Sequence, residues 1–165
     1  MIAFQTFYDM FLDRIERDRE FFMYNDTTEE IATEIIKERV KAYLIEAFDY
    51  LFLKCPSDIN FSDYDVDNET FGGEMSQAEI DLVVSIMFER YLERDISNLK
   101  AMANRFTTRD LNMFSPARER STYVAMFNQV VQENINKIRA YQSIDRTTGK
   151  FKTIDFSKYA TEGDD

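Results

Sequence analysis

The chain has 165 residues with a formal net charge of −11, and 44% of its residues are hydrophobic. This length suits one domain with a modest core, and the apolar content excludes a chain that is disordered by composition. Histidine is absent and Cys55 is the only cysteine, which removes the commonest general base and metal ligand and excludes an internal disulfide.

No apolar run approaches the roughly 20 residues that a membrane-spanning helix needs, so no membrane segment is expected. The N-terminal residues MIAFQTFYDMF lack the basic stretch of a secretory signal and reach Asp9 early. Together with the lone cysteine, these features predict a protein that is made in a reducing cytosol.

Four glycines and two prolines leave few helix breakers, which predicts long helices. The first predicted helix covers 4–23, where aromatic and aliphatic residues recur at spacings of three and four. The second starts at a capping box, Thr27–Glu30, carries an apolar stripe from Ile31 to Phe52 and ends before Pro56. Cys55, in its last turn, is interpreted as a small buried hydrophobe.

A second capping box, Ser76–Glu79, predicts a third helix that continues to about Asn104. Such a helix would be roughly 42 Å long, more than a small globule usually needs. A short helical turn is expected over 107–113, and the pair Ser115-Pro116 then starts a last long helix that ends near Ser143.

The predicted fold class is therefore all-α, a bundle of about four long helices plus one short helix. The helical domain is expected to span 1–143 and to contain an acidic loop at 56–75. Residues 144–165 are expected to form an extended C-terminal tail, in which 151–156 alternates polar and apolar residues in the manner of a short strand.

The charges divide unevenly along the chain. Residues 1–99 hold 9 basic and 23 acidic side chains, whereas residues 100–158 hold 11 basic and 5 acidic ones. One interpretation is that these charges are scattered by chance over solvated faces. The other is a bipolar molecule whose ends attract each other between copies, a head-to-tail contact that closes into a ring or continues as a filament.

The loop at 62–74 reads SDYDVDNETFGGE and has the spacing of a calcium-binding EF-hand. The candidate metal ligands are Asp63, Asp65, Asp67 and Glu74. Against this hypothesis, the preceding helix ends too early, Asn68 stands where glycine is usual, and no second loop exists. We favour an acidic arm that binds a basic neighbour, and apart from the calcium alternative no cofactor is expected.

Catalytic chemistry has little support, and the sequence predicts a protein that is not an enzyme. The spacing of Glu30, Glu34 and Glu38 is typical of a wet helical face, and Gly72-Gly73 lacks the lysine of a phosphate loop. The strongest basic cluster comprises Arg105, Arg109, Arg118 and Arg120. Because the chain is acidic overall, we expect this cluster to bind protein rather than nucleic acid.

Three segments carry a resemblance to a known family. They are YLIEAFDYLFLKC (43–55), DLVVSIMFERYLERDISNLKAM (81–102) and FTTRDLNMFSPARERSTYVAMFNQVVQENINKI (106–138). Packed helices, one very long helix and an acidic first part resemble the head–tail connector (adaptor) proteins of tailed bacteriophages. The chain is longer than compact members of that family, and its N-terminal Phe-rich helix has no assigned counterpart.

The resemblance implies a virion protein that forms a dodecameric ring between the portal and the tail-completion (stopper) protein, with DNA passing through the lumen without specific binding. It also implies that the segment 151–159 binds the portal, which makes Phe151, Ile154, Phe156 and Tyr159 candidate contacts. We therefore expect a structural protein of the phage neck. The alternatives are an EF-hand-like calcium module and a small helical phage or host regulatory protein that acts by protein contacts.

Overall fold

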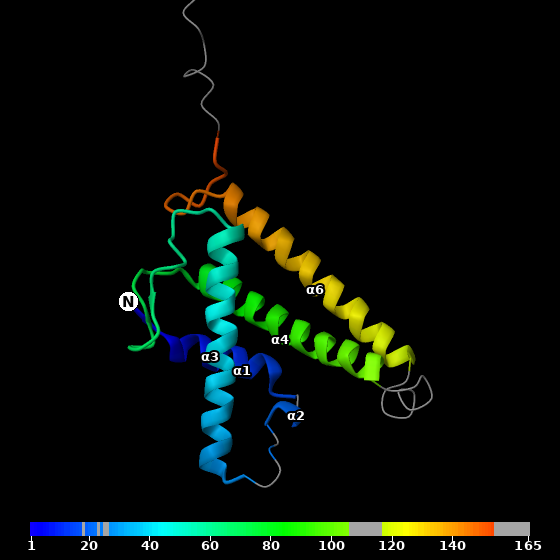
Figure 1. Ribbon diagram of the computed structural model, residues 1–165. Coiled ribbons are helices and arrows are strands. Elements are labelled where there is room, and N and C mark those ends of the chain that lie inside the picture. The colour runs from blue at the N-terminus through cyan, green and yellow to red at the C-terminus, as the bar shows by residue number, and fades with distance from the viewer. Residues whose placement is uncertain (18, 23, 25–26, 106–116, 154–165) are drawn as a thin grey trace, which may run out of the picture.

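The longest helix, α4 (Gln77–Arg105), lies at the centre of the molecule. Helix α3 (Glu29–Lys54) crosses it, α6 (Ala117–Ser143) runs back along it, and α1 (Phe4–Ile15) packs against both α3 and α4 (Figure 1). A single short turn, α2 (Arg19–Phe22), follows α1. This computed structural model describes residues 1–153 except 18, 23, 25–26 and 106–116. The predicted all-α bundle of about four long helices is confirmed.

Aromatic rings fill the core between α1, α3 and the loop that precedes α4. The ring of Phe48 on α3 is fully buried and lies 5.5 Å from the Phe7 ring and 5.9 Å from the Phe4 ring, between centroids. On its other side, the Tyr64 and Phe71 rings both lie 5.3 Å away. Aromatic contacts of this kind stabilise a core beyond the area that they bury, so Phe48 joins three separate segments.

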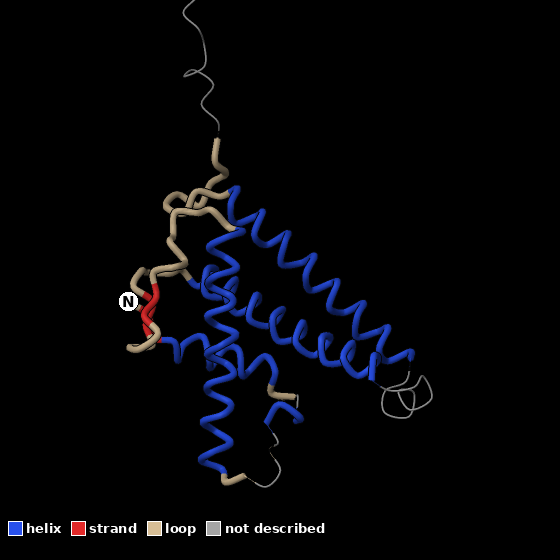
Figure 2. The backbone as a smooth tube through the Cα atoms, in the orientation of Figure 1, coloured by secondary structure: helices blue, strands red, loops and turns tan. Residues whose placement is uncertain are grey.

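A three-stranded sheet of very short strands covers one end of the bundle. Its order is β1 (Ile2–Ala3), β3 (Thr70–Phe71), β2 (Tyr64–Asp65), and both neighbours of β3 are antiparallel to it (Figure 2). The segment expected as a plain acidic loop therefore contains a β-hairpin that also pairs with the N-terminus. Two-residue strands leave no alternating pattern long enough to be recognised from sequence.

Several predicted boundaries are confirmed and others need correction. Helix α3 ends before Pro56, and the Ser76–Glu79 capping box starts α4, both as predicted. The prediction of one helix over 4–23 was wrong, because α1 ends at Ile15 and α2 is a separate turn. The N-cap of α3 is Thr28 rather than Thr27, and its hydroxyl accepts a hydrogen bond from the Ile31 amide.

Two further corrections concern the apolar stripe of α3. Ile31 and Phe52 were predicted to face inward, but they are 49% and 53% exposed. The buried residues of α3 begin only at Val40, because the N-terminal part of α3 extends past the other helices (Figure 1). The predicted short turn at 107–113 lies outside the described residues.

Replacement of Phe48 by alanine tests the central role of this ring. Because the side chain is fully buried among four other rings, Phe48→Ala should lower the free energy of unfolding by about 3–5 kcal/mol. The matched control is Phe52→Ala on the same helix, where an exposed ring should change stability by about 0.5 kcal/mol or less. Urea denaturation measures both values, and equal losses in the two variants would contradict the assignment.

Candidate functional site

Two carboxylates of the acidic hairpin at 62–74 have partners: one stabilises the turn of the hairpin, and the other binds α3. The Asp65 carboxylate accepts hydrogen bonds from the Asn68 and Asp67 amides and from the Asn68 side chain, at 2.7 to 3.0 Å. These bonds, led by those from Asn68, lower the pKa of Asp65. Glu69 forms ion pairs with Lys37 (2.9 Å) and Lys41 (3.1 Å) of α3, and these lysines lower the pKa of Glu69.

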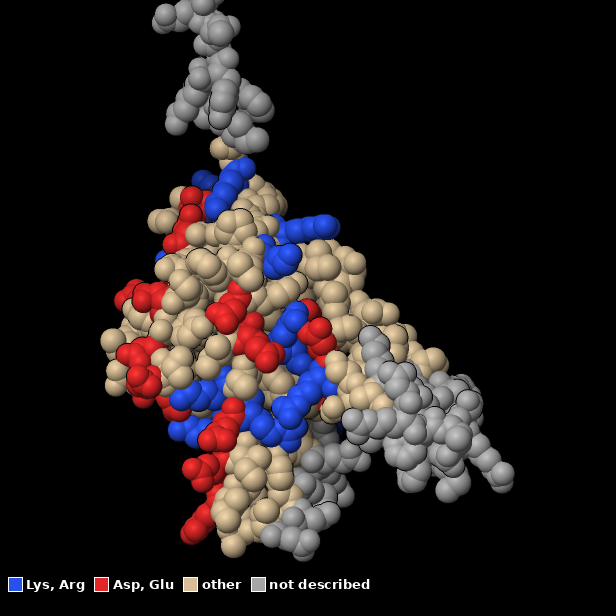
Figure 3. Space-filling view, in the orientation of Figure 1, with Lys and Arg blue, Asp and Glu red and all other residues tan. Residues whose placement is uncertain are grey.

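The remaining carboxylates of the hairpin belong to exposed residues, and the carboxylate of Asp63 lies against the backbone of Gly72. Asp63, Asp67 and Glu74 are exposed and form no side-chain hydrogen bond or ion pair within the described part of the chain. Figure 3 shows acidic side chains gathered over this end of the molecule. The hairpin is therefore held on α3 through Glu69 and leaves a negatively charged outer surface.

The candidate calcium site is not formed. Instead of joining two helices, Asp65 lies in β2 and Thr70 in β3 of an antiparallel hairpin. Asp65 already accepts three hydrogen bonds within the turn. Among the described residues, no three acidic or cysteine side chains converge where they could hold a metal ion, so Asp63, Asp65, Asp67 and Glu74 do not make the predicted set of ligands.

The basic cluster belongs to the opposite end of the long helices. Arg105 is the last residue of α4, and Arg118 and Arg120 lie in the first turns of α6. Arg109 lies outside the described residues. The hairpin lies beside the start of α4, and Figure 1 shows it on the far side of the molecule from the ends of α4 and α6 that carry the cluster. A helix of 29 residues is about 43 Å long, so hairpin and cluster are separated within one chain.

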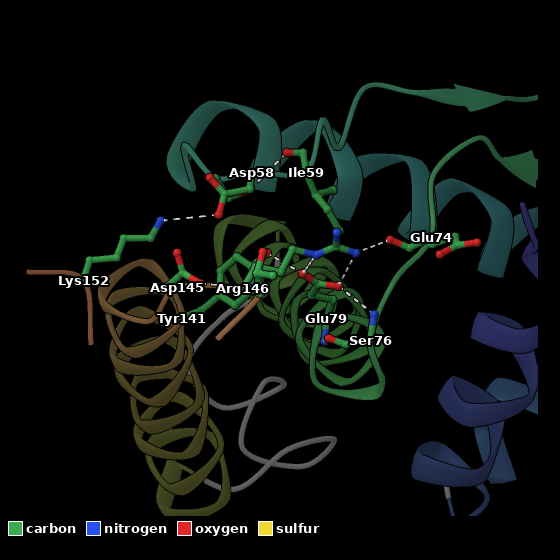
Figure 4. A network of polar contacts seen from close by, with 11 residues as sticks. Asp58, Ile59, Glu74, Ser76, Glu79, Tyr141, Asp145, Arg146 and Lys152 are labelled. Atoms are coloured by element: carbon green, nitrogen blue, oxygen red, sulfur yellow. Dashed lines mark hydrogen bonds and ion pairs between the residues drawn. The ribbon is translucent and has the colours of Figure 1, made fainter. Parts of the chain in front are cut away.

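A buried carboxylate fastens the start of α4 to the end of α6 (Figure 4). Glu79 is fully buried, and its side chain accepts hydrogen bonds from the Ser76 amide (2.6 Å), the Tyr141 hydroxyl (2.6 Å) and Nε of Arg146 (2.8 Å). Burial alone would raise the pKa of Glu79, but the bonds from Arg146, Tyr141 and Ser76 outweigh it, and the pKa is lowered. Arg146 also donates to the Glu74 carbonyl.

Further buried polar groups join the middle of the same two helices. The Asn134 amide of α6 donates to the Ser85 carbonyl (3.1 Å) and to Oε2 of Glu89 (2.8 Å), and all three residues are buried. Two cations also reach the Ser85 hydroxyl, Nζ of Lys137 at 2.8 Å and Nη1 of Arg14 at 3.2 Å. Nearer the end of α4, the Tyr123 hydroxyl donates to Asp95 at 3.0 Å. These contacts set one antiparallel register for α4 and α6.

The C-terminal contact residues are described only in part. Phe151 is 76% exposed, and its backbone forms an antiparallel bridge with Ile144. Lys152 lies 3.7 Å from Asp58 of the loop after α3. The other candidates, Ile154, Phe156 and Tyr159, lie outside the described residues. This segment thus leaves the bundle beside the end of α6 with an aromatic ring in solvent.

Sequence reasoning identified Glu79 only as a helix cap and did not identify Arg146, Lys137 or Arg14. Their partners lie 52 to 71 residues away in the chain, a separation at which no periodic pattern connects them. Cys55 is buried as interpreted, and burial raises the pKa of its thiol to about 11, which keeps it protonated near neutral pH.

No family model matches this chain, and neither a curated protein nor a solved structure was found that resembles it. Within the described ranges, no helix is both long and apolar enough to cross a membrane. The assignment of function therefore depends on the surfaces and charges of this molecule.

Loss of the guanidinium at position 146 tests the buried contact. Arg146→Ala leaves the Glu79 carboxylate buried with one charged partner fewer, which should lower the free energy of unfolding by about 2 kcal/mol. Lys152→Ala, which removes the exposed pair with Asp58, should cost about 0.5 kcal/mol or less. Thermal unfolding measures the stability of both variants. An Arg146→Ala protein as stable as the wild type would show that Glu79 does not depend on this partner.

The lowered pKa of Glu79 predicts how stability depends on pH. Since the folded-state pKa lies below the ordinary value of 4.5, this carboxylate stabilises the fold fully above about pH 4.5. That contribution is lost as the pH falls through the folded pKa. Glu79→Gln should therefore be clearly less stable than the wild type near pH 7, and the difference should shrink toward about pH 3. A stability difference independent of pH would refute this role.

Proposed function

We propose that this chain is a structural, non-catalytic protein that assembles head to tail with copies of itself. The observation that carries the proposal is that the acidic hairpin and the chain positions of three arginines lie at opposite ends of α4. The exposed carboxylates of the hairpin lie at one end of α4, and the positions of Arg105, Arg118 and Arg120 lie at the other end. Since the hairpin and these positions are separated within one chain, we infer that the hairpin pairs with the arginines of a neighbouring copy.

Contacts between such surfaces propagate around a ring. Each copy offers an acidic end and a basic end, so the interface is heterologous, and it closes when the rotation between copies divides a full turn. Electrostatic attraction mainly speeds and orients the encounter, while apolar contacts supply much of the affinity. Val124 and Met126 on α6, each 41% exposed, are available for that purpose next to the basic end.

A ring of this kind suits the neck of a tailed phage, which is the role that the resemblance of segments 43–55, 81–102 and 106–138 implies. In that setting the protein is part of the virion and lies between the portal and the tail-completion protein. Its acidic surplus favours the passage of DNA without specific binding, because like charges repel along the lumen. The resemblance assigns the portal contact to the segment 151–159, and the exposed ring of Phe151 is consistent with a segment that binds protein.

Light scattering at two salt concentrations tests the assembly. We expect oligomers at about 0.05 M salt that dissociate toward about 1 M salt, where charges are screened beyond roughly 3 Å. The triple variant Asp63→Asn, Asp67→Asn, Glu74→Gln should weaken self-association at low salt. These carboxylates have no partner among the described residues, so the fold should keep its stability.

The matched control makes the same change in net charge elsewhere. Asp13→Asn, Glu30→Gln and Glu46→Gln, at exposed positions of α1 and α3, should leave self-association unchanged. As a rescue, exchanging the signs of the two surfaces, with lysines in the hairpin and glutamates at Arg105 and Arg118, should restore it. A wild-type chain that stays monomeric at low salt and at high protein concentration would overturn the proposed assembly.

A further inference from the structure

An apolar groove lies between the start of α4 and the end of α6. It is open to solvent, with a volume of about 340 Å³. Its apolar lining consists of Ala78, Leu82, Ala140, Tyr141 and Ile144, and the charged residues Asp81 and Lys137 complete the wall. Ile144 is itself 37% exposed, so the wall of the groove near the C-terminal segment is an apolar surface in contact with water. Such a surface is stabilised when an apolar side chain covers it.

Two cations meet at the Ser85 hydroxyl, and one of them, Lys137, lines this groove. Both donate a hydrogen bond to that hydroxyl, Lys137 from α6 and Arg14 from α1. Neither forms an ion pair within the described residues. Burial lowers the pKa of both groups, while the nearby carboxylates of Asp81 and Glu133 act in the opposite direction. The positive charges of Lys137 and Arg14 therefore interact with Asp81 and Glu133 without forming an ion pair. A carboxylate that entered the groove would be attracted by both cations.

The chain itself carries a segment with the matching chemistry. Residues 154–165 read IDFSKYATEGDD, with Ile154 and Phe156 followed by Glu162, Asp164 and Asp165. In an extended conformation, Ile154 and Phe156 would point to the same side, because side chains alternate. The acidic residues that follow would then supply carboxylates to a pair of cations.

The last described residues show where this segment starts. Phe151 forms a bridge with Ile144, so the segment starts at the edge of the groove. Figure 1 shows the chain over 151–153 running away from the helices of its own copy. Twelve further residues span up to about 40 Å when extended, enough to reach another molecule.

We propose that residues 154–165 of one copy bind in the α4–α6 groove of a neighbouring copy, with Ile154 and Phe156 in the apolar part and the terminal carboxylates at Lys137 and Arg14. The inference rests on the proposed assembly and gives the C-terminal segment a partner within the ring, in place of the portal. Because every copy carries both a groove and a C-terminal segment, each copy would bind the segment of one neighbour and donate its own segment to another.

Photo-crosslinking in the full-length chain tests this contact. Phe156 is replaced by benzoyl-phenylalanine, the protein is irradiated, and products are separated on a denaturing gel and mapped by mass spectrometry. We expect products the size of two chains, with crosslinks to 78–82 and 137–144. Ala140→Trp, at an exposed position, should fill the groove and abolish these crosslinks.

The charged part of the contact has its own variants. Arg14→Gln with Lys137→Gln should reduce the yield of crosslinks about tenfold, the loss expected for hydrogen bonds to charged groups. Arg139→Gln, which changes an exposed residue of the same helix outside the lining of the groove, should leave the yield unchanged. Circular dichroism on each variant separates loss of the contact from loss of the fold.

The outcomes distinguish this inference from the proposed assembly. A synthetic peptide of residues 151–165 with benzoyl-phenylalanine at 156 is added to the full chain, and it should crosslink to the same groove. Crosslinking by the peptide in a chain that scattering finds monomeric would support the groove and overturn only the assembly. Assembled chains with no crosslink to the groove would overturn the inference alone, as would groove crosslinks confined to products the size of one chain.

Discussion

The rest of the structure depends on the burial of α4. Every residue from Leu82 to Met87 is buried, so this part of the helix is covered on all sides. A helix in that position must satisfy any polar side chain that it carries, since an unpaired buried polar group costs several times what a typical hydrogen bond contributes. Glu79, Ser85 and Glu89 are such groups, and each of them accepts at least one hydrogen bond from α6 or from the turn just after it.

This requirement gives the two long helices a defined register. Apolar packing alone tolerates a helix that slides by one turn, because similar side chains recur along the stripe. A slide of α6 along α4 would separate Asn134 from Glu89 and Tyr141 from Glu79 at once, and it would leave two buried carboxylates without these donors. The polar contacts therefore specify the arrangement that the apolar contacts stabilise.

The helical part of this fold could be predicted from sequence because its signals are local. The Ser76–Glu79 capping box, Pro56 and the spacing of apolar residues act within a few residues of the element that they define. The hairpin could not be predicted, because its strands of two residues are held by pairing with the N-terminus and by the contact of Glu69 with α3. The spacing of its aspartates is similar to that of a calcium loop because Asp65 accepts hydrogen bonds from backbone amides in a tight turn. Tight turns favour Asp and Asn at such positions. Only part of the role of Glu79 could be predicted from sequence. Its capping bond is local, but its bonds to Tyr141 and Arg146 join residues that are 62 and 67 positions apart.

The buried network around Glu79 also shapes the surface that we assign to a neighbouring copy. Tyr141 donates to Glu79 and lines the groove, so the same hydrogen bond fixes the ring and the wall that it forms. Arg146 binds Glu79 from the turn that follows Ile144, and the bridge from Ile144 to Phe151 then directs the C-terminal segment out of the molecule. Groove and departing segment are thus both positioned by one carboxylate. Loss of Glu79 would therefore disturb the acceptor and the donor of the same contact, which ties assembly to the integrity of the α4–α6 pair rather than to either surface alone.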